Sequence, residues 1–228
     1  LIQTKFTEKD GGFGRMILVE APVRNGGWDG KALVKFVHTV RQIVDFVRPG
    51  TSAVGQLPIS ADVFEIIQVD GPRATLFALF GVLALVVLLF RSLSDISLVL
   101  LSLALGLLWL NGMILWLGIK INFLNFIAFP ITFGIGIDYG VNIFQRYRLE
   151  GPGQIVPTLL HTGGAVGLAS LTTIIGYSSL LLAGNQAFVS FGGIAVLGEI
   201  TCLVAALVSL PAYLYFKDRK NTRLWATK

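Results

Sequence analysis

Five long apolar stretches limit what this chain can fold into more than any other feature of its sequence. A helix needs about 20 predominantly apolar residues to cross the roughly 30 Å hydrocarbon core of a bilayer. Of the 228 residues, 54% are apolar and 14% are charged, so we expect a mostly α-helical membrane protein rather than a water-soluble domain. The predicted membrane spans are residues 74–90, 96–117, 123–144, 165–184 and 189–215.

The distribution of basic side chains predicts how these spans are oriented. Lys and Arg are enriched in cytoplasmic loops, and eight of the ten in residues 73–228 lie at one end of the predicted spans, whereas the opposite end holds Lys120 and Arg73. We therefore expect residues 1–72 to be extracytoplasmic and the basic tail 217–228 to be cytoplasmic. Because no signal peptide precedes this outer segment, we also expect an upstream span in a longer polypeptide. The basic residues on the predicted cytoplasmic side are Arg91, Arg146, Arg148, Lys217, Arg219, Lys220, Arg223 and Lys228.

Residues 1–72 are predicted to form part of a small α+β domain. A strand is expected at 15–23 and a second at 52–56, on either side of a helix that ends at the sequence "RPG". The apolar residues of this helix recur every three or four positions, and a helix with one apolar face packs onto a sheet. About 50 residues make a thin core, so the remaining strands are expected upstream. A further short helix from Ser60 is expected to break at "DGP" before the first span.

Few residues carry the side chains that hydrolytic or metal chemistry requires. Two histidines, His38 and His161, and the single Cys202 do not make up a Ser/His/Asp or Cys/His constellation or a metal-ligand cluster. Residues 50–57, "GTSAVGQL", space two glycines as a phosphate-binding loop does, but lack the Lys and Ser/Thr that meet phosphate and magnesium. We therefore expect no enzyme activity, no metal, no cofactor and no nucleic-acid partner, and ATP is not the expected energy source.

Two acidic residues, Asp138 and Glu199, lie inside predicted spans. A charged residue at the centre of a spanning helix costs about 2.5 to 3.5 kcal/mol even on the lower scales, so such residues face the protein interior or a water-filled cavity and are usually functional. In the sequence "FGIGIDYGVNIF", Asp138 shares one helix face with Gly134 and Asn142 at four-residue spacing. We predict that Asp138 lies at a contact between helices.

Small side chains near both acids predict close helix packing. Gly136 and Gly140 form a small-xxx-small pair on the third span, and Glu199 lies in a seam of small residues on the last span. The seam consists of Gly192, Ala195, Glu199, Cys202, Ala206 and Ser209. The fourth span adds hydroxyl groups that can donate to a carboxylate or pass on a proton. They belong to Ser170, Thr172, Thr173, Tyr177 and Ser178.

A carboxyl group between spans is suited to carrying protons. Desolvation disfavours its ionised form, so it can take up and release a proton near neutral pH. An elementary charge that falls through 100 mV releases about 2.3 kcal/mol, so a proton crossing through Asp138 could drive a conformational cycle. A permanently protonated carboxyl that only holds helices together is the alternative for Asp138 and for Glu199.

Four segments together resemble the last helices of the resistance-nodulation-division superfamily, and more narrowly its lipid-exporting branch of the MMPL and hopanoid-exporter type. They are "GIGIDYG", "ASLTTIIGYSSLLLAG", "FGGIAVLGEI" and "VSLPAYLYF", and the resemblance covers residues 74–216. In that family a Gly-x-x-x-Asp-Tyr motif on a central helix forms the proton relay. Gly134, Asp138 and Tyr139 fill this motif here. The residues expected to support the relay are Gly134, Asn142, Thr172, Thr173, Tyr177 and Glu199.

The resemblance implies a larger assembly than this chain provides. The family is built from two six-helix halves, each with a porter-like extracytoplasmic domain, so this chain would be a C-terminal fragment that supplies five helices of the second half. It implies a partner Asp-Tyr pair in the missing N-terminal half of the same polypeptide, proton antiport driven by the proton-motive force, and export of lipid-like or hydrophobic substrates. The expected location is the bacterial inner membrane, in contact with membrane lipids, and a homo-oligomer is compatible with it.

Other functional classes compete with transport. The sequence "GIGID" is similar to the Gly-x-Gly-Asp of intramembrane aspartyl proteases, but here Asp138 comes one residue late and a second membrane Asp, which that chemistry needs, is lacking. A sterol-sensing regulator and a proton-driven export auxiliary would use the same helix bundle. A sensor needs no titrating group, so the Asp-Tyr pair favours transport.

Overall fold

Helices dominate the computed structural model, which describes residues 17–19, 30–122 and 124–226. The chain divides into two compact units, Leu1–Asp62 and Val63–Lys228. Helices that are long and apolar enough to cross a membrane confirm all five predicted spans. These membrane-length segments are Gln56–Leu89, Leu93–Trp116, Asn125–Glu150, Ile155–Leu182 and Gln186–Arg219.

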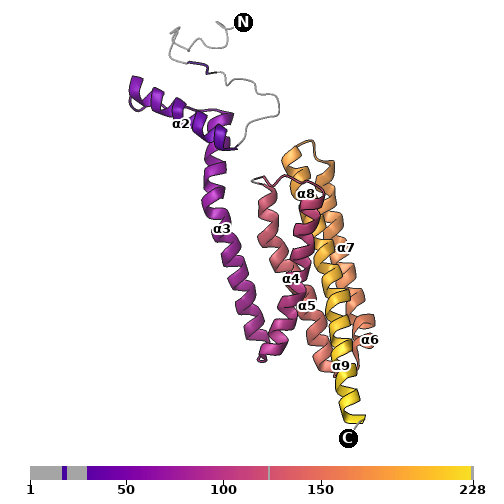
Figure 1. Ribbon diagram of the computed structural model, residues 1–228. Helices are drawn as coiled ribbons and strands as arrows, with labels where there is room; N and C mark the ends of the chain where they lie inside the picture. Colours follow the sequence, from indigo (N-terminus) through magenta and orange to yellow (C-terminus); the bar gives the residue numbers. More distant parts are fainter. Residues whose placement is uncertain (1–16, 20–29, 123, 227–228) are drawn as a thin grey trace. The chain divides into compact units, whose positions relative to one another are not determined.

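The first unit contains an amphipathic helix, α2, at Gly30–Val47 (Figure 1). Its position confirms the helix predicted from the three- and four-residue spacing of apolar side chains, and Val37 on its apolar face is buried. The helix ends before Pro49, which cannot continue the hydrogen-bond ladder. Arg41 donates two hydrogen bonds, of 2.7 and 2.8 Å, to the two carboxylate oxygens of Asp62.

The strands expected in the outer segment are not found in the described residues. Most of the first predicted strand, at 15–23, lies outside them, and residues 17–19 form no strand. The second, at 52–56, is wrong, because 51–54 carry no regular structure and α3 starts at Gln56. A strand needs a neighbouring strand for its backbone N–H and C=O groups, and the described part of this unit supplies none. The predicted α+β domain is therefore not shown.

The first membrane-length helix, α3, spans Gln56–Leu89 and is continuous through Pro72. The break predicted at the "DGP" sequence is therefore wrong. Proline removes one helical N–H donor, but the other backbone hydrogen bonds of this 34-residue helix persist. Gly71 also lets the helix approach a neighbour closely, since a Cβ at that position would lie 2.8 Å from the ring of Phe126.

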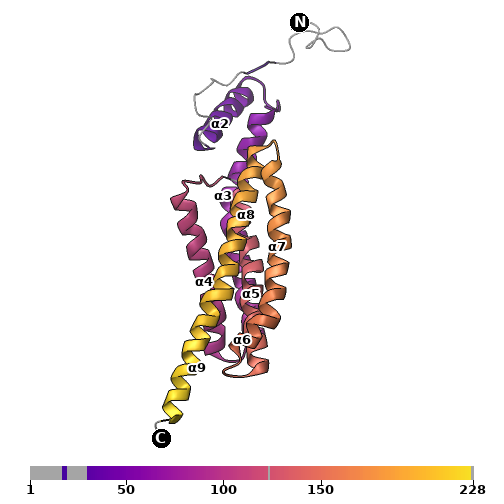
Figure 2. The same cartoon turned by 90° about the vertical axis from the view of Figure 1, so that its right-hand side faces the viewer.

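The remaining helices form a bundle. They are α4 (Leu93–Trp116), η1 (Asn125–Ile127), α5 (Ala128–Glu150), α6 (Ile155–Thr158), η2 (Leu159–Gly163), α7 (Gly164–Ser179), η3 (Leu180–Leu182), α8 (Gln186–Val204), η4 (Ala205–Ser209) and α9 (Leu210–Ala226). Helix α8 packs against α4, α5 and α7, and Figures 1 and 2 show these helices side by side. The π-helical segment η4 comes just before Pro211, whose missing N–H disturbs the α-helical ladder at Leu207.

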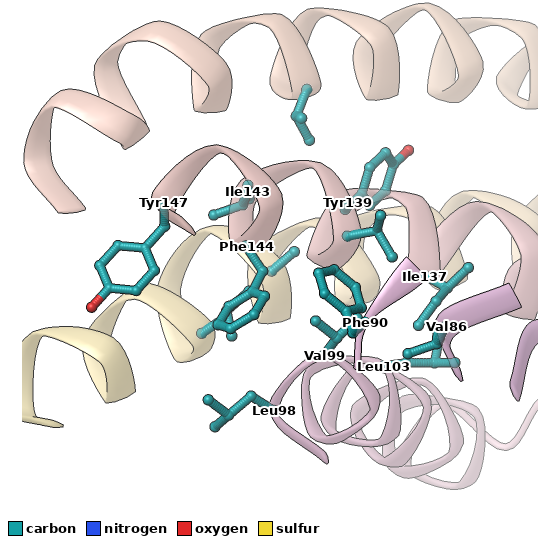
Figure 3. Packing of buried hydrophobic residues seen from close by; sticks show 14 of the residues in the cluster. Val86, Phe90, Leu98, Val99, Leu103, Ile137, Tyr139, Ile143, Phe144 and Tyr147 are labelled. Atoms are coloured by element: carbon teal, nitrogen blue, oxygen red, sulfur yellow. The ribbon is translucent and has the colours of Figure 1, made fainter. Parts of the chain in front are cut away.

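An apolar core joins α3, α4, α5 and the last helices (Figure 3). Val86 near the end of α3 and Phe90 just after it pack into this core, and the Phe90 ring meets Phe144 edge-on at a centroid distance of 5.4 Å. Arg148 places its guanidinium carbon 5.9 Å from the centre of the Phe90 ring and pairs with Asp95 of α4 at 3.5 Å. This end of α5 is thus fixed by apolar and charged contacts to α3 and α4.

The small residues predicted for close packing do bring helices together. A Cβ on Gly136 would lie 2.8 Å from Cys202 Sγ, and a Cβ on Gly106 would lie 2.9 Å from Cys202 Cα. Gly140 is less restricted, since its Cβ would meet Val99 at an ordinary 3.6 Å. The predicted seam, which runs along α8 and η4, is confirmed, because five of its residues are buried and Ser209 is partly buried. The buried five are Gly192, Ala195, Glu199, Cys202 and Ala206.

Candidate functional site

Helix α5 places Asp138 on a face that the other described helices leave uncovered. Gly134 and Asn142, one turn before and one turn after it, are exposed as well. The shared face predicted from the four-residue spacing is therefore present. Asp138 does not lie at the expected close helix contact, because the tight contact of α5 is made by the adjacent face, through Gly136. Side chains four residues apart lie on one face, so Gly136 and Asp138 necessarily point in different directions.

A cavity of about 220 Å³ lies beside Asp138, between α5 and α7. This volume exceeds what several water molecules occupy, and the polar atoms on its wall can bind water. The cavity is lined by Ile135, Asp138, Tyr139, Asn142, Val166, Ala169 and Thr173. Three predicted site residues besides Asp138 therefore come together here: Tyr139, Asn142 and Thr173.

Tyr139 connects this cavity to a second acid. The tyrosine is only 5% exposed, and its hydroxyl donates a hydrogen bond to Glu199 Oε1 on α8. Figure 3 shows the Tyr139 hydroxyl directed away from the rings of Phe90 and Phe144. Glu199 itself is 3% exposed. Asp138 at the cavity and Glu199 in the packed interior are thus linked, because Asp138 and Tyr139 are neighbours in α5 and Tyr139 donates to Glu199.

The surroundings of Glu199 are closely packed. Cys202 lies one turn further along α8, and a Cβ on Gly198 would lie 2.8 Å from Thr132 Oγ1. Among the described residues, no Lys or Arg forms an ion pair with Glu199. A buried carboxylate without a cation is costly, so the contact with Tyr139 is an important part of what stabilises this side chain.

Two other predicted residues are not part of this group. The Thr172 hydroxyl is exposed and donates to the backbone oxygen of Ala169 at 2.7 Å. Tyr177 packs edge-on against Phe191, with a centroid distance of 6.0 Å. Thr173 lines the cavity, but its hydroxyl also donates to Ala169 O, at 3.1 Å.

One buried polar group near the site was not distinguished by the sequence. Ser170 on α7 is fully buried, and its Oγ is the one buried side-chain oxygen or nitrogen without a hydrogen-bond partner in the described part of the chain. The sequence presents Ser170 only as one of several hydroxyls on the same span. Its isolation from water and from other polar groups depends on how α7 packs, which the spacing of residues within one helix does not reveal.

Comparisons with known proteins found a family model and several proteins that are similar to this chain. The model of the MMPL family matches residues 9–227. The putative membrane protein MJ1562 of Methanocaldococcus jannaschii is 27% identical in an alignment of 214 residues that covers 90% of this chain and 55% of that protein. The hopanoid transporter HpnN of Burkholderia multivorans is 27% identical over 80% of this chain and 22% of its own length. The apo-petrobactin exporter of Bacillus anthracis is 28% identical over 72% of this chain and 24% of its own length.

The chain therefore spans about half of the first relative and less than a quarter of the other two. No solved structure matches it.

Proposed function

Because the chain belongs to the MMPL family, a branch of the resistance-nodulation-division superfamily, we propose that it is part of a proton-driven transporter that exports lipid-like or other hydrophobic molecules. Two relatives are named as a hopanoid transporter and as an apo-petrobactin exporter, which supports export as the activity. The many apolar side chains on the described helices are compatible with the five membrane spans that such a transporter needs.

Proton coupling is proposed on one observation above all: Asp138 lies on a membrane-length helix, beside a cavity large enough for several water molecules. An ionisable group at bilayer depth is costly and is usually functional. Water in the cavity would let Asp138 exchange protons with solvent, and Asn142 and Thr173 offer polar atoms that can hold this water. A proton that crosses 100 mV releases about 2.3 kcal/mol, which is available to bias a conformational change.

The polar face of α5 around Asp138 is not covered by the other described helices, and such a face needs a protein partner within the membrane. We propose that the upstream half of the same polypeptide covers it and brings its own proton-carrying group close to Asp138. The proposed orientation places α2 on the extracytoplasmic side and the end of α9 in the cytoplasm of a bacterial cell, because basic residues gather at that end.

A sterol-sensing regulator and a proton-driven export auxiliary are the competing functions. Both could use this bundle, but a sensor that moves no protons has no need for a carboxyl group beside a cavity that can hold water. An auxiliary would conduct protons without moving lipid. Proton flux and lipid efflux must therefore be measured in the same preparation.

The test uses the full-length protein in liposomes with an imposed pH gradient. Internal pH reports proton flux, and a labelled hydrophobic lipid analogue reports efflux. We expect both to be lost in Asp138→Asn, which keeps the shape of the side chain but cannot ionise. Asp45→Asn is the matched control, since Asp45 is exposed on α2. If Asp138→Asn leaves both fluxes unchanged, the relay proposal is wrong; if only proton flux exists in the unmodified protein, an auxiliary is indicated.

A further inference from the structure

Glu199 has the position of a proton-holding group rather than of a structural one. It lies on α8, the helix that packs against α4, α5 and α7, and its side chain is almost completely buried. The hydrogen bond from Tyr139 satisfies Oε1, while Oε2 accepts no hydrogen bond from the described residues and, unlike Ser170 Oγ, is not completely shielded from solvent. A carboxyl group that served only to join helices would be expected to use both oxygens.

A possible second donor lies opposite, on α7. Antiparallel contacts fix how α7 and α8 are aligned: a Cβ on Gly192 would lie 2.9 Å from the backbone oxygen of Tyr177, and a Cβ on Gly163 would lie 3.2 Å from Leu207 Cδ2. Ser170 is midway between residues 163 and 177, and Glu199 is within one residue of the midpoint of 192 and 207. The two side chains therefore lie at the same level of the helix pair.

The isolated hydroxyl of Ser170 is an independent indication that a partner is needed at this level. A buried hydroxyl without a hydrogen bond costs free energy, and such groups are rare in folded proteins. Oε2 of Glu199 is the acceptor that would satisfy it, and the demand is greatest when the carboxyl group is ionised, since an ionised carboxylate is the stronger acceptor.

The charged and titratable groups around this level are few. Helix α5 contributes Asp138 and Tyr139, α8 contributes Cys202, and the titratable residue of α7 is Tyr177, two turns from Ser170. The titratable residue of α4 is Asp95 in its first turn, which pairs with Arg148. No cation of the described residues faces Glu199, so its ionisation depends on hydrogen-bond donors.

From these observations we propose that Glu199 is a second proton-holding site, which exchanges a proton with Asp138 through the Tyr139 hydroxyl, and that Ser170 stabilises the ionised Glu199. The inference rests on the proposed proton coupling and adds a site to it. In the transfer, Asp138 releases a proton to water in the cavity, the Tyr139 hydroxyl gives its proton to Glu199, and the tyrosine oxygen takes one from that water. Asp138 loses one proton, Glu199 gains one, and Tyr139 is unchanged.

The proposal is tested by infrared difference spectroscopy of the full-length protein in lipid nanodiscs, which detects protonated carboxyl groups without any transport. We expect a carboxyl band that titrates with pH, is lost in Glu199→Gln and persists in Asp138→Asn. In Ser170→Ala the midpoint of this band should rise by about one pH unit, as expected for one lost hydrogen bond to a charged group. Tyr139→Phe, which keeps the ring, should slow the response of the Glu199 band to a pH jump.

Asp45→Asn serves as the control that should change none of these signals, and thermal unfolding of each variant shows whether it is folded. A Glu199 band present at every pH would mean a permanently protonated structural carboxyl and would overturn the proposal. The proposal would also be overturned if the midpoint of the band were the same in Ser170→Ala, or if every carboxyl band persisted in Glu199→Gln. These outcomes do not depend on flux: loss of transport in Asp138→Asn with no titrating Glu199 band supports the proposed function and refutes this inference.

Discussion

Replacing Gly136 by alanine should separate α5 from its neighbours, because the position has no room for a methyl group. A Cβ there would lie 2.8 Å from Cys202 Sγ and 2.9 Å from Leu103 Cδ1. Forcing an extra methyl group into a packed core costs about 1 to 3 kcal/mol. Alanine returns about 1 kcal/mol of helix propensity relative to glycine, so the expected net effect is a loss of up to about 2 kcal/mol.

Gly140 provides the matched control on the same helix. Its Cβ would meet Val99 and Ser102 at 3.6 to 3.7 Å, which are ordinary contacts. Gly140→Ala should therefore gain most of the difference in helix propensity between alanine and glycine, and stabilise the protein by up to about 1 kcal/mol. The two single-methyl changes, one turn apart, are expected to differ in the sign of their effect.

The measurement is unfolding of the purified full-length protein in mixed micelles, followed by tryptophan fluorescence as denaturing detergent is added. A double-mutant cycle with Cys202→Ala identifies the contact, because removing Sγ should offset part of the cost of Gly136→Ala, by about 1 kcal/mol. Equal midpoints for the two glycine variants, or the same effect of Cys202→Ala in both backgrounds, would refute the packing described for Cys202.

Two further predictions concern the ends of the bundle. The side chain of Asn125 is fully buried, accepts a hydrogen bond from Asn122 N and donates to Lys120 O and Ser190 Oγ. Asn125→Ala should therefore lower the free energy of unfolding by about 2 kcal/mol and increase amide hydrogen exchange in the segment after Lys120. Unchanged exchange would contradict this prediction. Asp218 accepts 2.7 Å hydrogen bonds from both Tyr147 Oη and Gly153 N. Asp218→Asn weakens both bonds and Tyr147→Phe removes only one, so the first should lower the unfolding midpoint more. An equal effect would mean that the bond to Gly153 contributes nothing measurable.

Sequence patterns predicted the helices well, because the physical signals are local. Membrane spans follow from apolar length, and α2 follows from the spacing of its apolar residues and from the proline after it. The strand at 52–56 and the break at Pro72 were wrong, because a short apolar run and a proline do not decide structure without their neighbours. Whether a strand forms depends on a partner strand, and whether a proline ends a helix depends on the packing around it.

The candidate site was predicted in its residues more than in its arrangement. Spacing placed Asp138 and Asn142 on one face, and both line the cavity. The hydrogen bond between Tyr139 and Glu199 joins positions 60 residues apart, so it depends on how α5 and α8 are aligned. The sequence of one span does not reveal that alignment, because it results from a contact between spans, in which Gly106 and Gly136 fit around Cys202.

That fit around Cys202 has a mechanical consequence. Where a side chain is enclosed by two glycine backbones, axial sliding of one helix past the others would force backbone atoms into one another, so we expect α4, α5 and α8 to travel as a single rigid block during any working cycle. The boundary between α5 and α7 is more loosely filled, and the acidic side chain at position 138 would feel a rearrangement there first.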